Sequence, residues 1–500
     1  MSRLMSKLLV VVAIICASCP VYSATRYVSL DGGHDTAGGY ASWAGAATSI
    51  NDAVSIALPG EIILVSNGLY KLTNQISLGA NILRSWNNGA TDRDGTIIDG
   101  NFYEGKPVTN RCVEIVGSGA MVDGFTISNG CVKSYGGAGV FVRADADYAI
   151  ITNCCIVQNT NTVTVASSGA GVRMHGANGI LTHCLILSNS APMSGDAGAG
   201  GVYLSGSNNL MEFCEVGWNQ AQSAAGVILS AGNRASNCRI YGNSAGSWGG
   251  GFYLNASNAV LERCIVSNNF AGAALGGGAA YLRYGIVRNC ILVVNRTSGT
   301  HGGGIYVNNP ISDLTIESCL FANNIASNNS AAYGGGIAIQ HANSSFTGNV
   351  QVLNCTFTGN WGRDGNGGGI WMAVSAANAD KVAIKNTIAA GNKIWTLDRD
   401  IDAVGSGGSS AGTNCFAFCC SPTFNSFPPE QGNQMADPLF VSEHDYRLQK
   451  TSPCVNVGTN LAWMANAVDL AGLTRIDRFF CQVDMGCYEY LSQGMVFNLR

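Results

Sequence analysis

Residues 238–269 read CRIYGNSAGSWGGGFYLNASNAVLERCIVSNN, one whole unit of a repeat followed by the first residues of the next unit. The unit opens with Cys, any residue, an apolar residue, two further residues and then Asn. This opening occurs eight times, at Cys154, Cys184, Cys214, Cys238, Cys264, Cys290, Cys319 and Cys355. The step between copies runs from 24 residues, between Cys214 and Cys238, to 36 residues, between Cys319 and Cys355. A recurring unit of this length predicts a repeat architecture.

A second pattern alternates with the first, namely a run of Gly followed by an apolar, a variable and an apolar residue, as in residues 249–254 and 302–307. A third apolar position lies three residues before each Cys. Each unit therefore holds three short segments with a period of two, which indicates strands. Copies stacked about 4.8 Å apart bury these apolar faces in one column, which no single unit can do. We expect Asn and Gly at the corners because both tolerate left-handed backbone angles, and each corner Asn can bond to the Asn of the next coil.

The composition agrees with a long, thin core, since 47% of the residues are hydrophobic, only 12% are charged and 65 are Gly. The net charge of −4 gives no indication of nucleic acid as a partner. Arg3, Lys7, the apolar run 8–17 and small residues up to Ser23 predict a signal peptide over residues 1–23. No later stretch has the length and apolarity of a transmembrane segment, so we expect a secreted or cell-surface protein, and a monomer.

The patterns divide the mature chain into four parts. We expect an N-terminal cap and first coils over 24–100, the repeat array over 101–392, an irregular connection over 393–436 and a C-terminal module over 437–500.

These residues resemble three known families. The repeats resemble the pectin lyase-like right-handed β-helix superfamily, and residues 48–54 are similar to its short capping helix, with Thr48 or Ser49 as N-cap. Gly-Gly-apolar alternating with Phe-x-x-Asn is similar to the repeats of polymorphic outer-membrane proteins. The tail resembles the choice-of-anchor Q module of bacterial surface proteins through residues 437–440, 446–448, 452–454, 469–472 and 484–490. The resemblance implies an all-β, right-handed, single-stranded parallel β-helix (a solenoid) with a short N-terminal capping helix.

The repeated cysteines are too far apart in sequence for a metal site. The residue two after each Cys is apolar, so the thiols share the inward face and we expect a buried thiol ladder rather than disulfides, because stacked Cβ vectors run parallel. The cysteines outside the ladder are the better disulfide candidates in an exported protein, without assigned pairs. They are Cys112, Cys131, Cys415, Cys419, Cys420, Cys454, Cys481 and Cys487.

The middle residue after each Gly run is expected to face solvent on the outer side of one sheet. Stacking turns these positions into a stripe that includes Tyr203, Tyr253, Tyr281, Tyr306 and Trp371. Aromatic faces stack on sugar rings, so the stripe predicts carbohydrate-binding residues. The alternative is structural, because aromatic residues favour sheet positions, pack across strands and can be covered by a loop.

Candidate catalytic groups are few, and the catalytic residues stay unknown. Glu212, Glu262 and Glu317 share the position two before the Cys, and Arg173, His175 and His183 form a possible basic cluster. The acidic run 398–402 offers calcium ligands or is an acidic loop of the tail module; otherwise we expect no cofactor and no metal.

Three hypotheses for function follow. The first is a non-catalytic surface or secreted protein that binds extracellular polysaccharide or a cell-envelope component, as an adhesin-like scaffold. The second is a polysaccharide lyase or glycoside hydrolase of the same superfamily. The third is a structural spacer. We favour the first, because acid–base residues are scarce in the array.

Overall fold

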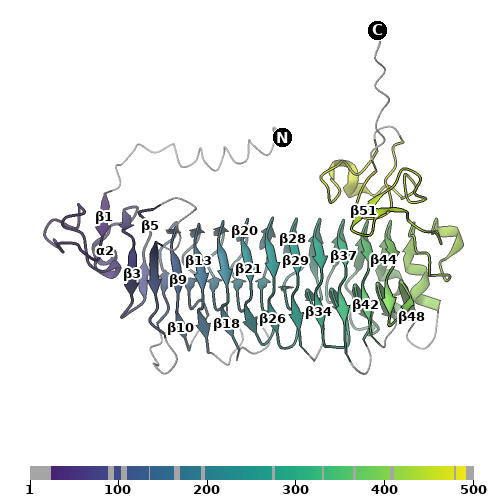
Figure 1. Cartoon of the computed structure of the whole chain (residues 1–500), viewed down its shortest axis with the longest axis horizontal. Coiled ribbons are helices and arrows are strands. Elements are labelled where there is room, and N and C mark those ends of the chain that lie inside the picture. Colours follow the sequence, from purple (N-terminus) through teal and green to yellow (C-terminus); the bar gives the residue numbers. More distant parts are fainter. Residues whose placement is uncertain are drawn as a thin grey trace, which may run out of the picture.

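The computed structural model describes residues 24–87, 95–102, 110–133, 136–162, 169–192, 198–272, 276–328, 332–363, 367–405, 410–477 and 480–490. The predicted signal peptide, residues 1–23, lies outside the described residues. The described residues form a right-handed parallel β-helix whose coils stack along the long axis of the molecule, and residues 437–477 and 480–490 lie on its side near β37 (Leu320–Ala322) and β44 (Val382–Lys385) (Figure 1). The predicted fold class is therefore confirmed.

From β8 (Met121–Asp123) on, each coil contributes strands to four sheets rather than to the three expected. Sheet A has 14 strands from β1 (Thr25–Val28) to β49 (Phe416–Ala417), sheet B has 12 from β3 (Gly68–Lys71) to β45 (Ile388–Ala390), and sheet C has 12 from β4 (Ile76–Leu78) to β48 (Ile401–Gly405). The fourth, called here the short-strand sheet, has 11 strands from β10 (Cys131–Val132) to β47 (Leu397–Asp398). Its strands mostly have two residues, too few to show a periodicity in the sequence.

The coil around Cys264 illustrates the order of these strands. It runs through β27 (Phe252–Leu254) in sheet C, β28 (Val260–Glu262) in sheet A, β29 (Ile265–Ser267) in sheet B and β30 (Phe270–Ala271) in the short-strand sheet. The next coils repeat it in register with β32 (Gly285–Arg288) and β36 (Leu314–Glu317) in sheet A. Equal positions of the repeat therefore form rows along the helix axis.

The cysteines form the predicted ladder in the core. Cys238, Cys264 and Cys290 lie in one buried hydrophobic cluster. Each of these thiols donates to the carbonyl two residues earlier, as from Cys264 Sγ to Glu262 O at 3.2 Å. Cys419, which was expected outside the ladder, belongs to it, because its Sγ donates to Ala417 O at 3.4 Å in the same way.

The Asn residues form a second ladder, which confirms the predicted bonding between coils. From Asn159 to Asn360, the backbone N and Nδ2 of each Asn donate to Oδ1 of the Asn in the next coil, at 2.8–3.1 Å. The explanation by backbone angles was wrong for these residues. The left-handed residues are those directly before each ladder Asn, such as Val294 with a φ of 58°. The ladder Asn is therefore required for its side-chain hydrogen bonds.

A second line of left-handed residues lies directly before the ladder cysteines, where sheet A turns into sheet B. We call this line the ridge; its φ angles lie between 49° and 55° for Asn153, His183, Phe213, Asn237, Arg263, Asn289, Ser318 and Asn354. Side chains at this corner contact the C-terminal residues, as Asn289, Ser318 and Asn354 do.

The N-terminal end is closed by helix α2 (Ile50–Ile56), as predicted. Ser49 is the N-cap, and its hydroxyl accepts a hydrogen bond from Asp52 N at 3.2 Å. Ile50 and Ala53 are buried against the first coils, so the helix shields the open end of the core.

The C-terminal module comprises β50 (Phe440–Ser442), β51 (Asp445–Leu448) and the 3-10 helix η4 (Ala462–Asn466), and it is held by the ridge. The side-chain amides of Asn289 and Asn354 on the ridge donate to Val468 O and Asp484 O at 3.1 and 3.2 Å. Asn386, at the same corner of the following coil with a φ of 51°, donates to Thr459 O at 2.9 Å. Residues 393–436, expected to be irregular, still contribute β48 and β49 to sheets C and A.

The anchor of the module is the fully buried Arg475. Its guanidinium donates to Glu489 Oε1 at 2.7 Å and to Ser318 Oγ on the ridge at 2.8 Å. The module therefore packs on the coils through paired polar groups. In the described part of the chain, no helix has the length and apolarity to cross a membrane.

Candidate functional site

The five rings of the predicted carbohydrate-binding stripe lie on the outer side of sheet C, but they are covered. Tyr203, Tyr253, Tyr281, Tyr306 and Trp371 are only 2–7% exposed and form a hydrophobic cluster of their own. The expectation that they face solvent was therefore wrong. Asn308 Nδ2 donates to the Tyr281 hydroxyl at 3.1 Å, and the Tyr306 hydroxyl donates to Gln340, so polar neighbours also occupy their hydroxyl groups.

The cover over the stripe consists of Trp248, His301 and Tyr333, each directly before a Gly run. Trp248 stacks on Tyr281 with ring centroids 5.5 Å apart, His301 on Tyr306 at 4.6 Å and Tyr333 on Trp371 at 4.7 Å. Gly302 and Gly334, which follow His301 and Tyr333, have φ angles of 64° and 63°, a left-handed conformation that Gly adopts without steric cost. An aromatic residue before a Gly run was the sequence signal for this cover.

The predicted basic cluster is divided between two faces. Arg173 is buried in sheet C between the rings of Phe141 and Tyr203, at 5.7 and 5.6 Å from their centroids. Burial, followed by the nearby Arg173, lowers the pKa of His175. His183 lies instead on the ridge, stacked on Phe213 at 5.2 Å. These residues do not form one site.

The three glutamates two before the Cys do lie in one row, on the outer face of sheet A. The register is Glu212, Ser236, Glu262, Arg288, Glu317, so Arg288 stands between two carboxylates. The sequence analysis noted the glutamates and missed Arg288, which occupies the same repeat position.

Glu262 is the centre of the row and is only 2% exposed. Arg288 donates to Glu262 Oε2 at 2.7 Å, Arg263 Nη1 lies 3.6 Å from Oε1, and Arg234 also bonds to Oε1. One carboxylate thus holds three guanidinium groups, each of them partly exposed to solvent. Arginine is suited to binding a further carboxylate because its planar group presents paired N–H donors.

The module closes one side of this cluster and makes a cavity of about 370 Å³, which we call the arginine pocket. Its lining is Arg234, Glu262, Arg263, Arg288, Asn289, Glu317, Trp463, Asn466, Ala467 and Val468. Three guanidinium charges against two carboxylates leave a charge of +1. Burial raises the pKa of Glu317, which shifts the pocket further towards positive charge as the pH falls.

Two buried N–H groups of this lining lack an acceptor within the described residues, namely Arg234 Nε and Trp463 Nε1. A buried donor without a partner costs about 1–3 kcal/mol, so such groups usually have a ligand or a water. Burial, followed by repulsion from Arg288 and Arg263, lowers the pKa of Arg234. The pocket therefore offers donors and positive charge to an acceptor-rich anion.

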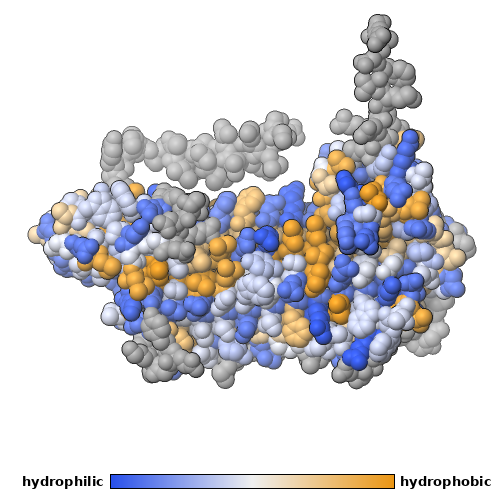
Figure 2. Space-filling view, viewed as in Figure 1, coloured by the Kyte–Doolittle hydropathy of each residue, from blue (hydrophilic) through white to orange (hydrophobic). Residues whose placement is uncertain are grey.

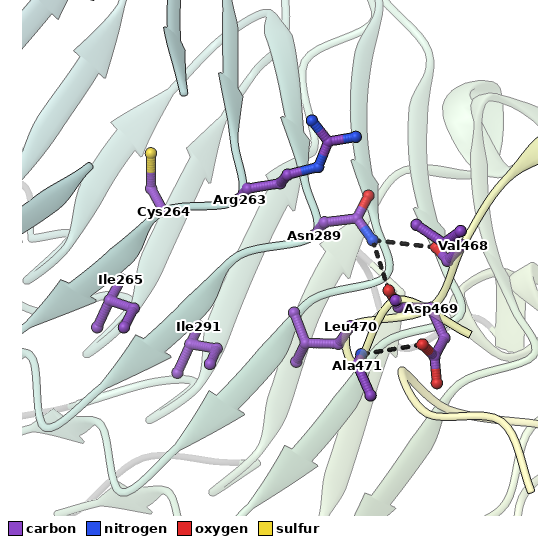
Figure 3. A pocket seen from close by; sticks show the side chains of 10 residues that line it. Arg263, Cys264, Ile265, Asn289, Ile291, Val468, Asp469, Leu470 and Ala471 are labelled. Atoms are coloured by element: carbon purple, nitrogen blue, oxygen red, sulfur yellow. Dashed lines mark hydrogen bonds between the residues drawn. The ribbon is translucent and has the colours of Figure 1, made fainter. Parts of the chain in front are cut away.

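A second cavity, of about 340 Å³, lies across the ridge and is called the ridge pocket. Figure 3 shows Ile265 and Ile291 on its floor and Asn289 bonded to Val468 and Asp469 at its wall. Arg263, Asn289 and Val468 line both cavities, so the two meet at the ridge. Figure 2 shows hydrophobic side chains along the coils up to the base of the module.

The acidic residues of the run 398–402 differ in their exposure to solvent and in their partners. Asp398 is exposed, whereas Asp400 is buried and accepts from Asn392 N and Nδ2 at 2.8 and 2.9 Å, so it terminates the Asn ladder. Among the described residues, no group of three or more His, Cys, Asp or Glu side chains is placed to hold a metal ion.

The chain is similar to known proteins in its fold. A family model described as a right-handed beta helix region matches residues 111–291. The structure is similar to that of the pectate lyase Pel9A, with a TM-score of 0.38 and 13% identity over 93% of this chain and 97% of that chain. It is also similar to a mannuronic acid specific polysaccharide family 6 lyase enzyme from human gut microbiota, with a TM-score of 0.44 and 13% identity over 83% and 92%. No curated protein matches the sequence.

Proposed function

We propose that this protein binds an anionic, carboxylate-bearing polysaccharide at the arginine pocket. The observation that carries the proposal is the convergence of Arg234, Arg263 and Arg288 on a single buried carboxylate beside two N–H groups without acceptors. A sugar carboxylate supplies the missing negative charge, and sugar oxygens supply acceptors for Arg234 Nε and Trp463 Nε1.

A polymer fits this site better than a small anion. The arginine pocket continues across the ridge into the ridge pocket, and the row of polar groups follows the stacked coils. We place the protein outside the cell, secreted or attached to the surface, where such polymers occur. Its resemblance to outer-membrane repeats and to the choice-of-anchor Q module, and its monomeric state, stay predictions.

The sugar contacts predicted for Tyr203, Tyr253, Tyr281, Tyr306 and Trp371 also stay a prediction. For Tyr253, Tyr281, Tyr306 and Trp371 they require Trp248, His301 and Tyr333 to move away, because these side chains pack on the rings. Tyr203 lies instead against Arg173.

The test is the affinity of the full chain for uronic acid oligosaccharides and for neutral oligosaccharides of equal length. We expect binding of the acidic series only, weakened by salt, and a loss of about tenfold or more in Arg288→Ala and in Arg263→Ala. Arg296→Ala is the matched control, because Arg296 is an exposed arginine of the short-strand sheet, outside both cavities. Equal affinity of all four proteins contradicts the proposal.

A second candidate is a polysaccharide lyase. Glu317 favours it, because a carboxyl with a raised pKa beside Arg288 has the properties of an acid–base group next to a bound carboxylate. Glu262 is engaged by three arginines and is unsuited to that role. New ultraviolet absorbance on uronate polymers, lost in Glu317→Gln while binding persists, supports a lyase; its absence in wild type leaves the binding function alone.

A further inference from the structure

Cys419 and Cys420 are neighbours in sequence that face opposite sides of the last coil. Cys419 points inward and belongs to the thiol ladder, with its Sγ 3.3 Å from Ile384 O. Cys420 pairs with Ile388 in the register of sheet B, in the row that contains Leu320 and Thr356. That row faces the C-terminal module, since Thr356 Oγ1 accepts from Cys487 N at 3.1 Å.

The module presents a second cysteine to Cys420. Cys454 and Cys420 are both fully buried in one cluster with Ile388, Leu448 and Met485. Cys454 is fixed by its own backbone, because its carbonyl accepts from Met485 N at 3.0 Å. Cys420 Sγ donates to Ala436 O at 3.2 Å, which fixes its thiol in this cluster. The neighbouring thiol is the first cause that lowers the pKa of Cys420 and raises that of Cys454, in agreement with their proximity.

This pair differs from the thiol ladder. Ladder cysteines stack in register on neighbouring coils, so their Cα–Cβ bonds run parallel and each Sγ is bonded to a carbonyl of its own segment. Parallel Cβ vectors are unfavourable for a disulfide. Cys420 and Cys454 come from a coil and from the module, two segments that pack face to face.

We propose that Cys420 and Cys454 form a disulfide that fastens the C-terminal module to the last coil. The two thiols lose their protons and two electrons, the Sγ–Sγ bond forms, and the electrons reduce an external disulfide such as oxidised glutathione to two thiols. An exported protein meets such oxidants. The bond keeps the module on the ridge, and it is independent of any polysaccharide.

The test is mass spectrometry of the full chain after exposure to oxidised glutathione, alkylation of free thiols in denaturant and digestion without reduction. We expect one cross-linked peptide between the segments of Cys420 and Cys454, a mass lower by two hydrogens, and a lower thermal midpoint after reduction. Cys419→Ser keeps the cross-link and Cys420→Ser loses it, which distinguishes the two neighbours.

Exposed Cys481 is the internal control, because its glutathione adduct shows that oxidant reached the protein. If Cys481 carries glutathione while Cys420 and Cys454 are both recovered alkylated, the proposal is wrong. A cross-link that persists in Cys420→Ser also overturns it. Wild-type mass spectrometry decides the matter even where a serine variant fails to fold.

Discussion

Arg288 donates from Nε to Glu262 Oε2 at 2.7 Å, one coil along sheet A, and so connects a buried carboxylate to a partly exposed cation. The position two before the ladder Cys is elsewhere occupied by groups as different as Thr182 and Leu353. The stacked fold does not require a charged residue at this position. We therefore attribute the cluster of Glu262 and its arginines to the binding of an anionic ligand.

Glu262→Gln is expected to destabilise the protein by about 1–3 kcal/mol, because three guanidinium groups lose their shared counter-charge. Denaturant unfolding measures the change. Glu212→Gln is the control from the same row, since no ion pair of Glu212 is found among the described residues. Equal stability of the two variants contradicts our description of the cluster.

Asn269→Ala is expected to cost about 3–5 kcal/mol in unfolding free energy. It removes bonds to Ile240 O and Asn295 Oδ1 and leaves Asn243 N and Nδ2 without their acceptor. Asn268→Gly, directly beside it at a left-handed position, is expected to be nearly neutral. If Asn269→Ala changes the thermal midpoint only slightly, the Asn ladder is not a major source of stability.

Val294→Asn is expected to stabilise the protein by about 1 kcal/mol. A β-branched residue at a φ of 58° is strained, and Asn tolerates this conformation. Asn268→Val, the reverse change at the equivalent place in the previous coil, is expected to destabilise by a similar amount. Thermal midpoints of both variants check the prediction, which fails if the two shifts have the same sign.

The cover over the aromatic stripe is expected to weaken in acid. Burial lowers the pKa of His301 to about 4, below the ordinary value of 6.5, so the folded state holds this ring neutral. The unfolded state then binds more protons between pH 6.5 and about 4, and stability falls as the pH falls through that window. His301→Phe keeps the stacking and removes the titration.

Unfolding free energies of wild type and His301→Phe, compared from pH 7 to pH 4, measure this contribution. The difference is expected to grow in favour of the variant as the pH falls, up to about 3 kcal/mol. His444→Gln, an exposed control, follows wild type. Parallel curves for wild type and His301→Phe are inconsistent with a partly buried His301 that the folded state keeps neutral.

The repeat predicted the fold well because residues at equal positions of the repeat lie above one another in neighbouring coils. Cys, Asn and Gly recur wherever the inward face and the corners demand them, and the rows of the structure are the columns of the aligned repeat. The exposure of the stripe was mispredicted because alternation places Tyr306 outside the coil, but it does not show that His301 folds back over it.

The arginine pocket was only half visible in the sequence. Glu262, Arg288 and Glu317 share a repeat position, so their row can be found by alignment. Trp463 cannot, because it belongs to the module, and only docking of the module on the ridge brings it to Arg288. The spacing of the repeat does not predict contacts between the coils and the C-terminal module, because the module lies outside the repeat.

The most direct test is a crystal structure of the full chain with a uronic acid oligosaccharide. The account predicts a sugar carboxylate bonded to the guanidinium groups of the arginine pocket, with ligand oxygens about 2.7–3.2 Å from Arg234 Nε and Trp463 Nε1. An oligosaccharide bound elsewhere, with the pocket holding water alone, contradicts it.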